Sequence, residues 1–583
     1  MGGYLLDAVL FLPVAGALML MALPAREKGA LRGFALAVSV TTFLLSLVVW
    51  RRFDPADAGF QLVTDVAWVE SVGIRFHVAL DGISLWLVLL TTFISPIAIA
   101  STFRAVDDRV KEFMAAFLVM ESAMLGAFVA RDLFLFFVFW EAMLIPMYLL
   151  IGVWGSQRRI YATVKFFLFT MAGSVLMLIA ILYVYLKAGA TSFEPEALHT
   201  AALSGGEQKW LFAAFALAFA IKVPMFPLHT WLPDAHTEAP TAGSVILAAV
   251  LLKLGTYGML RFALPLFPAA TVAFAPLFAV LSVVAILYGA FMALAQHDVK
   301  KLIAYSSVSH LGYVTLGLVM GTEASVQGAL LQMVNHGLST GALFLGVGVL
   351  YERRHTRLIA EYGGVAARMP VFATVFMLAT LSSIGLPGLN GFVGEFLVLL
   401  GTYRSGEVAG APWYAALGAA GVIFGAVYML WTYQRVMFGP LKNPANKELE
   451  DLTPREVAYF LPLVAMMVVI GVYPKLLLDP MAPSVRAFVA RYHDDRVTAA
   501  ARAEVEDLAV PVTPGVGTAG PKRPAPPKGA AGTPAAPGAM HPAAPGMPRT
   551  AAPLRAPGAP VPGAAGAPPG VTTPAPATAG GLR

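Results

Sequence analysis

The sequence predicts an all-α membrane protein of about fourteen transmembrane helices. Of its 583 residues, 58% are hydrophobic and 13% are charged, whereas globular domains average about 25% charged residues. Apolar runs of about 20 residues, the length that spans a bilayer, follow one another along the chain. Lysine and arginine gather in short clusters between these runs. This is typical of membrane loops and not of the basic stripe that binds nucleic acid.

The first expected span is an uncleaved helix. It is followed by Arg26, Lys28 and Arg32, whereas a signal peptide carries its charges before the apolar run. In chain order, the expected spans cover residues 4–23, 31–50, 80–103, 113–130, 133–153, 160–186, 211–232, 240–262, 272–295, 302–320, 326–350, 371–400, 413–431 and 458–478.

Positively charged loops predict the orientation. Basic pairs such as Arg158 with Arg159, and Lys300 with Lys301, fall in alternate loops, and the loops between them hold fewer basic residues. The richer loops are expected in the cytoplasm. With an even number of spans, both termini are expected on the periplasmic side of a bacterial inner membrane.

Two expected spans are interrupted by helix-breaking residues. Two prolines follow Lys222 directly, and the segment 385–391 places a proline and several glycines just before Glu395. Proline removes a backbone donor, and unwound backbone at membrane depth is tolerated where it is buried or lines a wet cavity. Paired interruptions in two halves are typical of inverted-repeat transporters, although a single proline kink is more simply explained by packing.

The interruptions suggest how the chain is organised. Each broken helix is the fourth of five spans, and an odd number of spans makes consecutive copies inverted. The expected parts are three N-terminal helices in 1–112, two five-helix repeats in 113–262 and 272–431, a C-terminal helix with its flank in 432–495, and a tail in 510–583. The tail is rich in Pro, Ala and Gly, a composition that predicts disorder.

Ionisable side chains lie inside several expected spans. Glu141 is about nine residues into its span, which places it roughly 13 Å deep in a core of about 30 Å. A charge at mid-membrane costs about 2.5–3.5 kcal/mol on insertion scales, so each one requires a reason. The residues with this placement are Glu141, Lys222, Lys253, His310, His336 and Glu395. A structural ion pair or interhelical hydrogen bond explains a single histidine equally well, but two lysines and two glutamates together favour function.

These residue types suit a proton relay. Burial lowers the pKa of lysine and raises that of glutamate, so the two can exchange protons near neutral pH. Histidine titrates near pH 6.5 and can pass a proton between its two ring nitrogens. The order Lys, Lys, His, Glu across successive helices therefore indicates a lateral proton path, with Glu141 setting the charge of Lys222.

The sequence argues against redox and metal centres in this chain. It contains no cysteine, which excludes disulfides, thiolate metal ligands and cysteine-ligated iron–sulfur clusters. His229 and His236 lie seven residues apart, a spacing that matches no common metal signature. The segment that holds them is either a point where protons enter or a capping turn, and the sequence does not separate the two.

Five motifs closely resemble the antiporter-like chains of bacterial respiratory complex I, over about residues 1–490. They are Asp81-Gly-Ile-Ser-Leu85, Phe139-Trp-Glu-Ala-Met-Leu-Ile-Pro-Met-Tyr148, the run from Lys222 to His236, Leu252-Lys-Leu-Gly-Thr-Tyr-Gly258 and the run from Gly385 to Glu395. Among the sister chains L, M and N, the resemblance is to M, the counterpart of mitochondrial NADH dehydrogenase chain 4, because L and N usually have lysine where this sequence has Glu395.

The resemblance implies a fourteen-helix fold with two inverted repeats and one proton channel. It implies that Glu141 and Lys222 form the family's Lys–Glu pair, that Lys253, His310 and His336 are relay positions, and that Glu395 is the terminal group. It further implies that the protein works in a complex that oxidises NADH and reduces quinone. Its partners would then be the sister chains L and N and other membrane subunits, while FMN, iron–sulfur clusters and quinone belong to other subunits.

Two other interpretations remain open from the sequence. The first is a subunit of a multi-chain Na⁺/H⁺ antiporter or membrane-bound hydrogenase, whose large chains look similar. The second is a membrane scaffold that conducts nothing. A scaffold predicts that Lys222→Ala and Glu141→Gln leave proton pumping intact.

Overall fold

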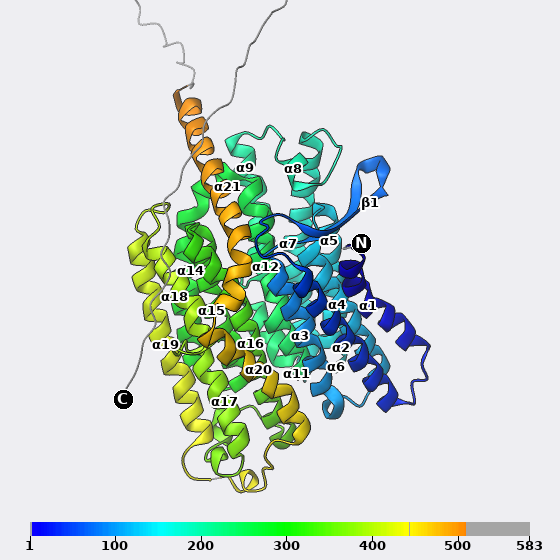
Figure 1. Ribbon diagram of the computed structural model, residues 1–583. Coiled ribbons are helices and arrows are strands. Elements are labelled where there is room, and N and C mark those ends of the chain that lie inside the picture. Colours follow the sequence, from blue (N-terminus) through cyan, green and yellow to red (C-terminus); the bar gives the residue numbers. More distant parts are fainter. Residues whose placement is uncertain (1–2, 442, 509–583) are drawn as a thin grey trace, which may run out of the picture. The chain divides into compact units, whose positions relative to one another are not determined.

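The computed structural model describes residues 3–441 and 443–508. These residues form a bundle of helices with a short β-hairpin near one end (Figure 1). The tail predicted to be disordered, residues 510–583, lies outside the described residues.

The first part of the chain places two outer helices against two inner ones. α1 (Gly3–Ala22) and α2 (Lys28–Arg52) both pack against α4 (Val110–Val129), and α3 (Leu85–Ala105) packs between α2 and α4. Outer helices of a membrane bundle keep apolar side chains on their exposed face, and Leu18 and Leu44 are exposed in this way.

An antiparallel hairpin joins α2 to α3. It pairs β1 (Gln61–Val69) with β2 (Ile74–Leu80). Gly73 turns the chain with φ of 68°, and a Cβ at this position would lie 2.0 Å from the carbonyl oxygen of Thr191. Glycine is therefore required here by both conformation and space. This hairpin was not predicted, and it is added to an otherwise helical fold.

The next helices contain two breaks, of which only the one after Lys222 was predicted. α5 (Leu133–Ala142) and α6 (Leu144–Trp154) form one span that is broken at Met143, and α7 (Arg159–Lys187) follows. After the short α8 (Pro195–Leu198), α9 (Gly205–Lys222) ends at Lys222, and the chain resumes as a helix only in α10 (Trp231–Glu238). The prolines after Lys222 account for this interruption.

The span that carries Lys253 is continuous but irregular. It consists of α11 (Thr241–Ile246), α12 (Leu252–Gly258) and α13 (Leu264–Leu266). Two π-helical turns, Leu247–Leu251 and Met259–Ala263, join these pieces. Such turns are rare and often occur at functional sites.

The second half repeats the pattern of long helices around an interrupted one. It runs through α14 (Pro268–Leu294), α15 (Val299–Met320), α16 (Glu323–Arg354), the pair α17 (Pro370–Ser383) and α18 (Asn390–Tyr403), and α19 (Ala411–Met437). α20 (Pro454–Val472) and α21 (Lys475–Leu508) complete the described chain. The predicted last span therefore ends at Val472, earlier than expected, and α21 is a separate helix.

The predicted class and the two broken helices are confirmed. Twelve helices among the described residues are long and apolar enough to cross a membrane. The two remaining predicted spans, 211–232 and 371–400, correspond to the interrupted pairs α9–α10 and α17–α18. The expected division into two inverted repeats stays a prediction.

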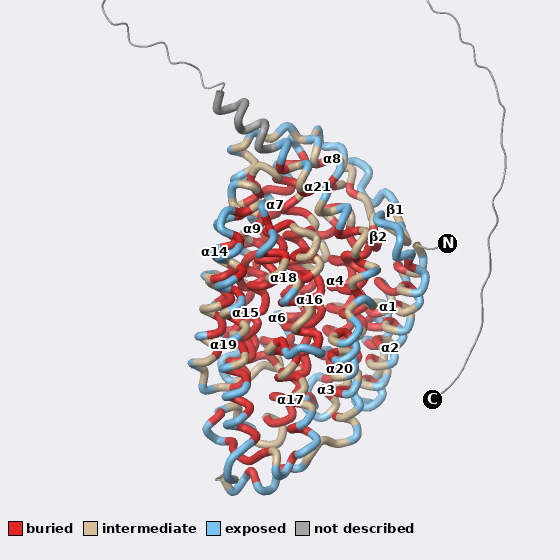
Figure 2. The backbone as a smooth tube through the Cα atoms, turned by 60° about the vertical axis from the view of Figure 1, so that its left-hand side comes forward, coloured by how far each residue is buried: buried red, intermediate tan, exposed pale blue. Residues whose placement is uncertain are grey.

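α16 lies in the centre of the second half. It packs against α15, α17, α18 and α20, and it also contacts α3 and α11. Figure 2 shows buried residues throughout the middle of the bundle and exposed residues along the outer helices. A Cβ on Gly328 would lie 2.6 Å from the backbone nitrogen of Val398, so this glycine lets α16 and α18 approach closely. The close approach brings Glu395 of α18 against α16.

Candidate functional site

Four of the predicted site residues form one series of contacts inside the bundle. Lys253 on α12 is fully buried, and its Nζ lies 2.7 Å from Nδ1 of His336 on α16. The rings of His336 and His310 meet edge to face, with 5.8 Å between their centroids. Nδ1 of His310 on α15 lies 2.8 Å from Oε1 of Glu395. The structure thus brings together Lys253, His336, His310 and Glu395 from four helices, and this series is called the relay below.

Lys253 is held by backbone as well as by His336. Its Nζ also donates to the backbone carbonyl of Ala248, which lies in the first π-helical turn. A π-helical turn leaves carbonyl groups without their usual helical partner, so the turn offers an acceptor to the buried ammonium. The irregular helix therefore positions Lys253 toward α16.

Glu395 is fixed by side chains that the sequence analysis did not single out. Gln332 Nε2 donates to its Oε1 at 3.0 Å, and Ser383 Oγ lies 3.2 Å from Nε2 of His310. Asn335 Nδ2 donates to the backbone carbonyl of Asn390 at 2.7 Å, which ties α16 to the start of α18. The available signal was the group Gln332, Asn335 and His336 within an apolar run, since buried polar groups require partners.

The break between α17 and α18 makes room for the Glu395 carboxyl group. Gly385 has φ of 74°, and a Cβ there would lie 3.2 Å from Oε2 of Glu395. A Cβ on Gly391 would lie 2.0 Å from the carbonyl oxygen of Ser382. Both glycines are therefore required for the chain to turn back tightly beside the carboxyl group.

Lys222 lies apart from this relay. It is 1% exposed at the end of α9, and its Nζ lies 5.1 Å from the ring centroid of Trp140 and 5.9 Å from that of Phe166. Glu141 is half-buried on α5 beside Trp140. Within residues 3–441 and 443–508, no ion pair joins Glu141 to Lys222. The expected pair thus shares one neighbourhood, without direct contact.

The two histidines after the first break have separate surroundings. His229 stacks on Phe226 and lies edge-on to Tyr288, whereas His236 stacks on Phe344 of α16. His236 is fully buried, and neither ring nitrogen has a hydrogen-bond partner among the described residues. No group of three or more His, Cys, Asp or Glu side chains with metal-binding geometry occurs in the described part of the chain.

One buried carboxyl group was missed from the sequence. Glu121 on α4 is 1% exposed, and its Oε2 accepts a hydrogen bond from Ser39 Oγ of α2 at 2.9 Å. It lies in the expected span 113–130, so the rule that selected Glu141 also selects Glu121. No hydrogen bond among the described residues connects it to the relay.

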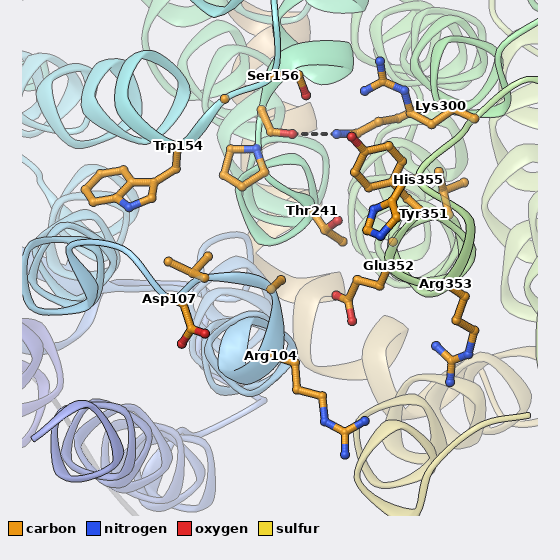
Figure 3. Close-up of a pocket in the computed structure, with 18 of the residues that line it drawn as sticks. Arg104, Asp107, Trp154, Ser156, Thr241, Lys300, Tyr351, Glu352, Arg353 and His355 are labelled. Atoms are coloured by element: carbon orange, nitrogen blue, oxygen red, sulfur yellow. Dashed lines mark hydrogen bonds between the residues drawn. The ribbon is translucent and has the colours of Figure 1, made fainter. Parts of the chain in front are cut away.

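A cavity of about 650 Å³ opens at the end of the bundle where the basic loops lie (Figure 3). Arg104, Asp107, Lys300 and Glu352 are among its lining residues. Nζ of Lys300 donates to the backbone carbonyl of Ala239 at 2.6 Å, which ties the start of α15 to the chain between α10 and α11. Charged side chains share the wall with apolar ones, as expected where a membrane bundle meets water.

A second set of charges lies at the opposite end of the spans. Nη2 of Arg261, in the second π-helical turn, donates to both carboxylate oxygens of Asp81, at 2.7 Å each. Asp132 caps α5 by accepting from the backbone nitrogen of Leu135. Burial raises the pKa of Asp132 to about 6, against the lowering effect of its backbone hydrogen bonds.

Comparison with known families gives a single result over most of the chain. The family described as NADH:quinone oxidoreductase/Mrp antiporter, TM, matches residues 130–425. NADH-quinone oxidoreductase subunit M of Rhodobacter capsulatus is 51% identical over 512 residues, covering 85% of this chain and 98% of the relative. NADH-ubiquinone oxidoreductase chain 4 of Arabidopsis thaliana is 46% identical, covering 83% of this chain and 97% of the relative.

Solved structures give the same result. A chain of respiratory complex I from Thermus thermophilus superposes with a TM-score of 0.76 at 35% identity, covering 84% of this chain and 99% of that one. An archaeal membrane-bound sulfane sulfur reductase has a TM-score of 0.73 at 26% identity, covering 82% and 77%. A chain of the Mrp complex from Dietzia has a TM-score of 0.73 at 21% identity, covering 85% and 99%, which shows a shared fold alone.

Proposed function

The chain belongs to the family of NADH-quinone oxidoreductase subunit M and its mitochondrial counterpart chain 4, and we propose that its relay from Lys253 to Glu395 carries the protons. The family's role is that of a proton-translocating membrane subunit, so the chain serves a translocase that couples NADH oxidation and quinone reduction to proton transport. Its lower identity to the reductase and Mrp chains favours this role over the antiporter and hydrogenase alternatives.

The proposal rests on the series of contacts in the relay. A protonated Lys253 can donate to Nδ1 of His336 at 2.7 Å, and histidine can accept a proton on one nitrogen and release one from the other. Transfer from His336 to His310 requires rotation of a ring or a water molecule between their nitrogens, because their centroids are 5.8 Å apart. His310 then reaches Glu395 directly at 2.8 Å.

Lys222 and Glu141 are proposed to act before the relay. Two aromatic rings stabilise the Lys222 ammonium, and Glu141 beside Trp140 adds a negative charge nearby. A change in the charge of Glu141 would therefore alter how readily Lys222 releases its proton.

We also propose the partners of the chain and its location. Apolar side chains are exposed on outer helices such as α7 and α19, for example Leu168 and Ile423, which suits contact with lipid and with neighbouring membrane subunits. We propose the sister chains L and N as those neighbours, a bacterial inner membrane as the location, and the basic loops as its cytoplasmic side, which leaves both termini periplasmic. FMN, iron–sulfur clusters and quinone are assigned to other subunits, and the two halves, 113–262 and 272–431, to inverted repeats.

The test is Lys253→Met in the assembled complex in membrane vesicles. Proton pumping and quinone-linked turnover should fall together by about 100-fold, the lower range for loss of a proton-transfer group. A native gel and NADH oxidation by an artificial acceptor should be normal, because neither requires proton transfer through this chain. Glu141→Gln tests the earlier pair in the same way.

A matched control distinguishes the loss of a relay lysine from the loss of a lysine elsewhere in the chain. Lys209 lies on α9 and is exposed, so Lys209→Met removes the same side chain outside the buried network and should leave pumping unchanged. Normal pumping in Lys253→Met, with assembly intact, would show that the relay does not carry the protons.

A further inference from the structure

A small cavity lies beside the Glu395 end of the relay. About 10 Å³ of it is open to the centre of a water molecule, which is room for one water. Its wall includes His310, Glu395, Ser383 and Tyr428, the last from α19. α19 contributes none of the predicted relay residues, so Tyr428 is a side chain that the proposed function does not use.

The Tyr428 hydroxyl is buried without a partner. Tyr428 is 0% exposed, and its Oη has no hydrogen-bond partner among the described residues. Ser306 on α15 gives its hydroxyl proton to the backbone carbonyl of Ile303 at 2.7 Å, so it does not donate to Tyr428. An unpaired buried hydroxyl is costly, and most are satisfied by protein or by ordered water.

Other hydroxyl groups in the cavity wall already have partners. Tyr313 Oη donates to the carbonyl of Gly418 at 2.7 Å, and Ser309 Oγ donates to the carbonyl of Ile286 at 2.8 Å. Ser383 Oγ is bonded to His310. Tyr428 therefore has its bonding capacity free next to the relay.

Glu395 offers the complementary acceptor. Its hydrogen bonds to His310 and Gln332 both use Oε1, so Oε2 is the oxygen that another donor can reach. A water between Tyr428 Oη and Glu395 Oε2, with His310 or Ser383 as a third neighbour, would make the two to four hydrogen bonds that buried waters usually make.

We propose that this cavity binds one water molecule and that Tyr428, acting through this water, is a positioning residue for the Glu395 carboxyl group. The proposal deepens the proposed function, since it rests on Glu395 being the terminal proton group. Tyr428 itself would neither accept nor lose a proton. It would hold the water, and the water would hold the free carboxylate oxygen and offer a route for the proton that reaches Glu395.

The surroundings of Glu395 leave few other groups for this role. His310 and Tyr313 face it from α15, His336 lies behind His310 on α16, and Tyr428 faces it from α19. From α17 the hydroxyl of Ser383 completes the wall. Of these, Tyr428 combines a free hydroxyl with a place beside the cavity.

The test is Tyr428→Phe in the intact complex, which removes the hydroxyl and keeps the ring. Maximal quinone-linked turnover and pumping should fall about 2- to 10-fold, the effect of about one hydrogen bond. The KM for quinone should not change, and the slowing in deuterated water should increase because proton transfer now limits the rate. A high-resolution structure of the native complex should show water density between Tyr428 and Glu395.

Tyr433→Phe is the matched control. Tyr433 lies on the same helix, is 5% exposed, and donates through Oη to the carbonyl of Ala373 at 3.0 Å. Its loss costs a buried hydrogen bond away from the relay, so turnover and the solvent isotope effect should stay normal. Equal behaviour of the two variants, or a native structure without that water, would overturn the proposal.

Glu395→Gln separates this proposal from the proposed function. If Glu395→Gln abolishes pumping while Tyr428→Phe behaves as the native protein, the relay stands and the role of Tyr428 is wrong. If Glu395→Gln pumps normally, Glu395 is not the terminal group, and both proposals fail at that residue.

Discussion

The ion pair between Asp81 and Arg261 should be a main source of stability at the end of the bundle opposite the basic loops. Nη2 of Arg261 donates to both carboxylate oxygens of Asp81 at 2.7 Å, and the side chains of Asp81 and Arg261 are 5% and 12% exposed. Asp81→Asn keeps the shape and an oxygen for the backbone nitrogens of Ile83 and Ser84, which Asp81 now caps. It removes the charge, however, and leaves Arg261 buried beside a neutral group.

The expected cost follows from that burial. Removing one partner of a buried pair costs about 3–5 kcal/mol, because the remaining charge is uncompensated. Folded proteins are stable by only about 5–15 kcal/mol in total, so a large share of the margin would be lost. The pair Arg75–Asp65 gives a control near the same end of the bundle, at 2.6 Å but with 40% and 37% exposure. Asp65→Asn should cost about 1 kcal/mol or less, as exposed pairs do.

The assay is thermal. Membranes that carry each variant are heated through a series of temperatures, and the complex that remains assembled is measured on native gels. Asp81→Asn should lose the complex well below the native midpoint, Asp65→Asn should match the native protein, and adding Arg261→Gln to Asp81→Asn should recover part of the loss. If Asp81→Asn is as stable as Asp65→Asn, burial does not make this pair important and the reasoning is refuted.

Two further perturbations test the fold around the site. Burial raises the pKa of Asp132 from 3.8 to about 6, so the folded state favours the neutral carboxyl group. The folded protein therefore keeps the full stabilisation from Asp132 below pH 4 and loses it as the pH rises through 6, where Asp132 becomes charged. The loss is about 3 kcal/mol by pH 7, and Asp132→Asn, which stays neutral, should gain stability over the native protein across that range in thermal assays at each pH. Gly328→Ala should destabilise by about 1–3 kcal/mol through overpacking, because its Cβ would lie 2.6 Å from Val398 N. Gly33→Ala is the control, because a Cβ at Gly33 would meet no atom within 4 Å. This variant should be neutral or stabilising by up to about 1 kcal/mol in the same heating assay. Equal behaviour of the two glycine variants would contradict the packing argument.

The helical class and both broken helices could be predicted because they depend on local sequence. Apolar length sets the number of spans, and the prolines after Lys222 and before Glu395 set the interruptions. The hairpin of β1 and β2 lies between spans, where hydropathy gives no signal, and its turn depends on a contact between Gly73 and Thr191 far along the chain. The break at Met143 was not predicted, although it also has a local cause: Pro146 has no N–H to donate to the carbonyl of Ala142, where α5 ends.

The relay residues could be selected from the sequence, but their order of contact could not. Lys253 reaches His336 from a helix that a π-helical turn, Leu247–Leu251, has made irregular, and Glu395 reaches Gln332 where Gly328 lets α16 and α18 approach closely. Hydropathy and spacing describe one helix at a time, whereas both contacts join different helices. Glu121 shows the opposite limit: its depth in the span selects it, yet its carboxyl group accepts a hydrogen bond from the Ser39 hydroxyl and does not join the series of contacts in the relay.

The two buried lysines have different surroundings, which indicates different roles. Lys253 has an acceptor at 2.7 Å, whereas the Nζ of Lys222 faces the rings of Trp140 and Phe166. An aromatic ring stabilises a cation but cannot accept its proton. Trp140 also packs against Phe219 at 5.5 Å, and a Cβ on Gly255 of α12 would lie 2.8 Å from the Phe219 carbonyl oxygen. The two helices are therefore tightly packed between the lysines. We expect a proton on Lys222 to wait until water or a side chain moves into that contact, while transfer beyond Lys253 follows contacts that already exist.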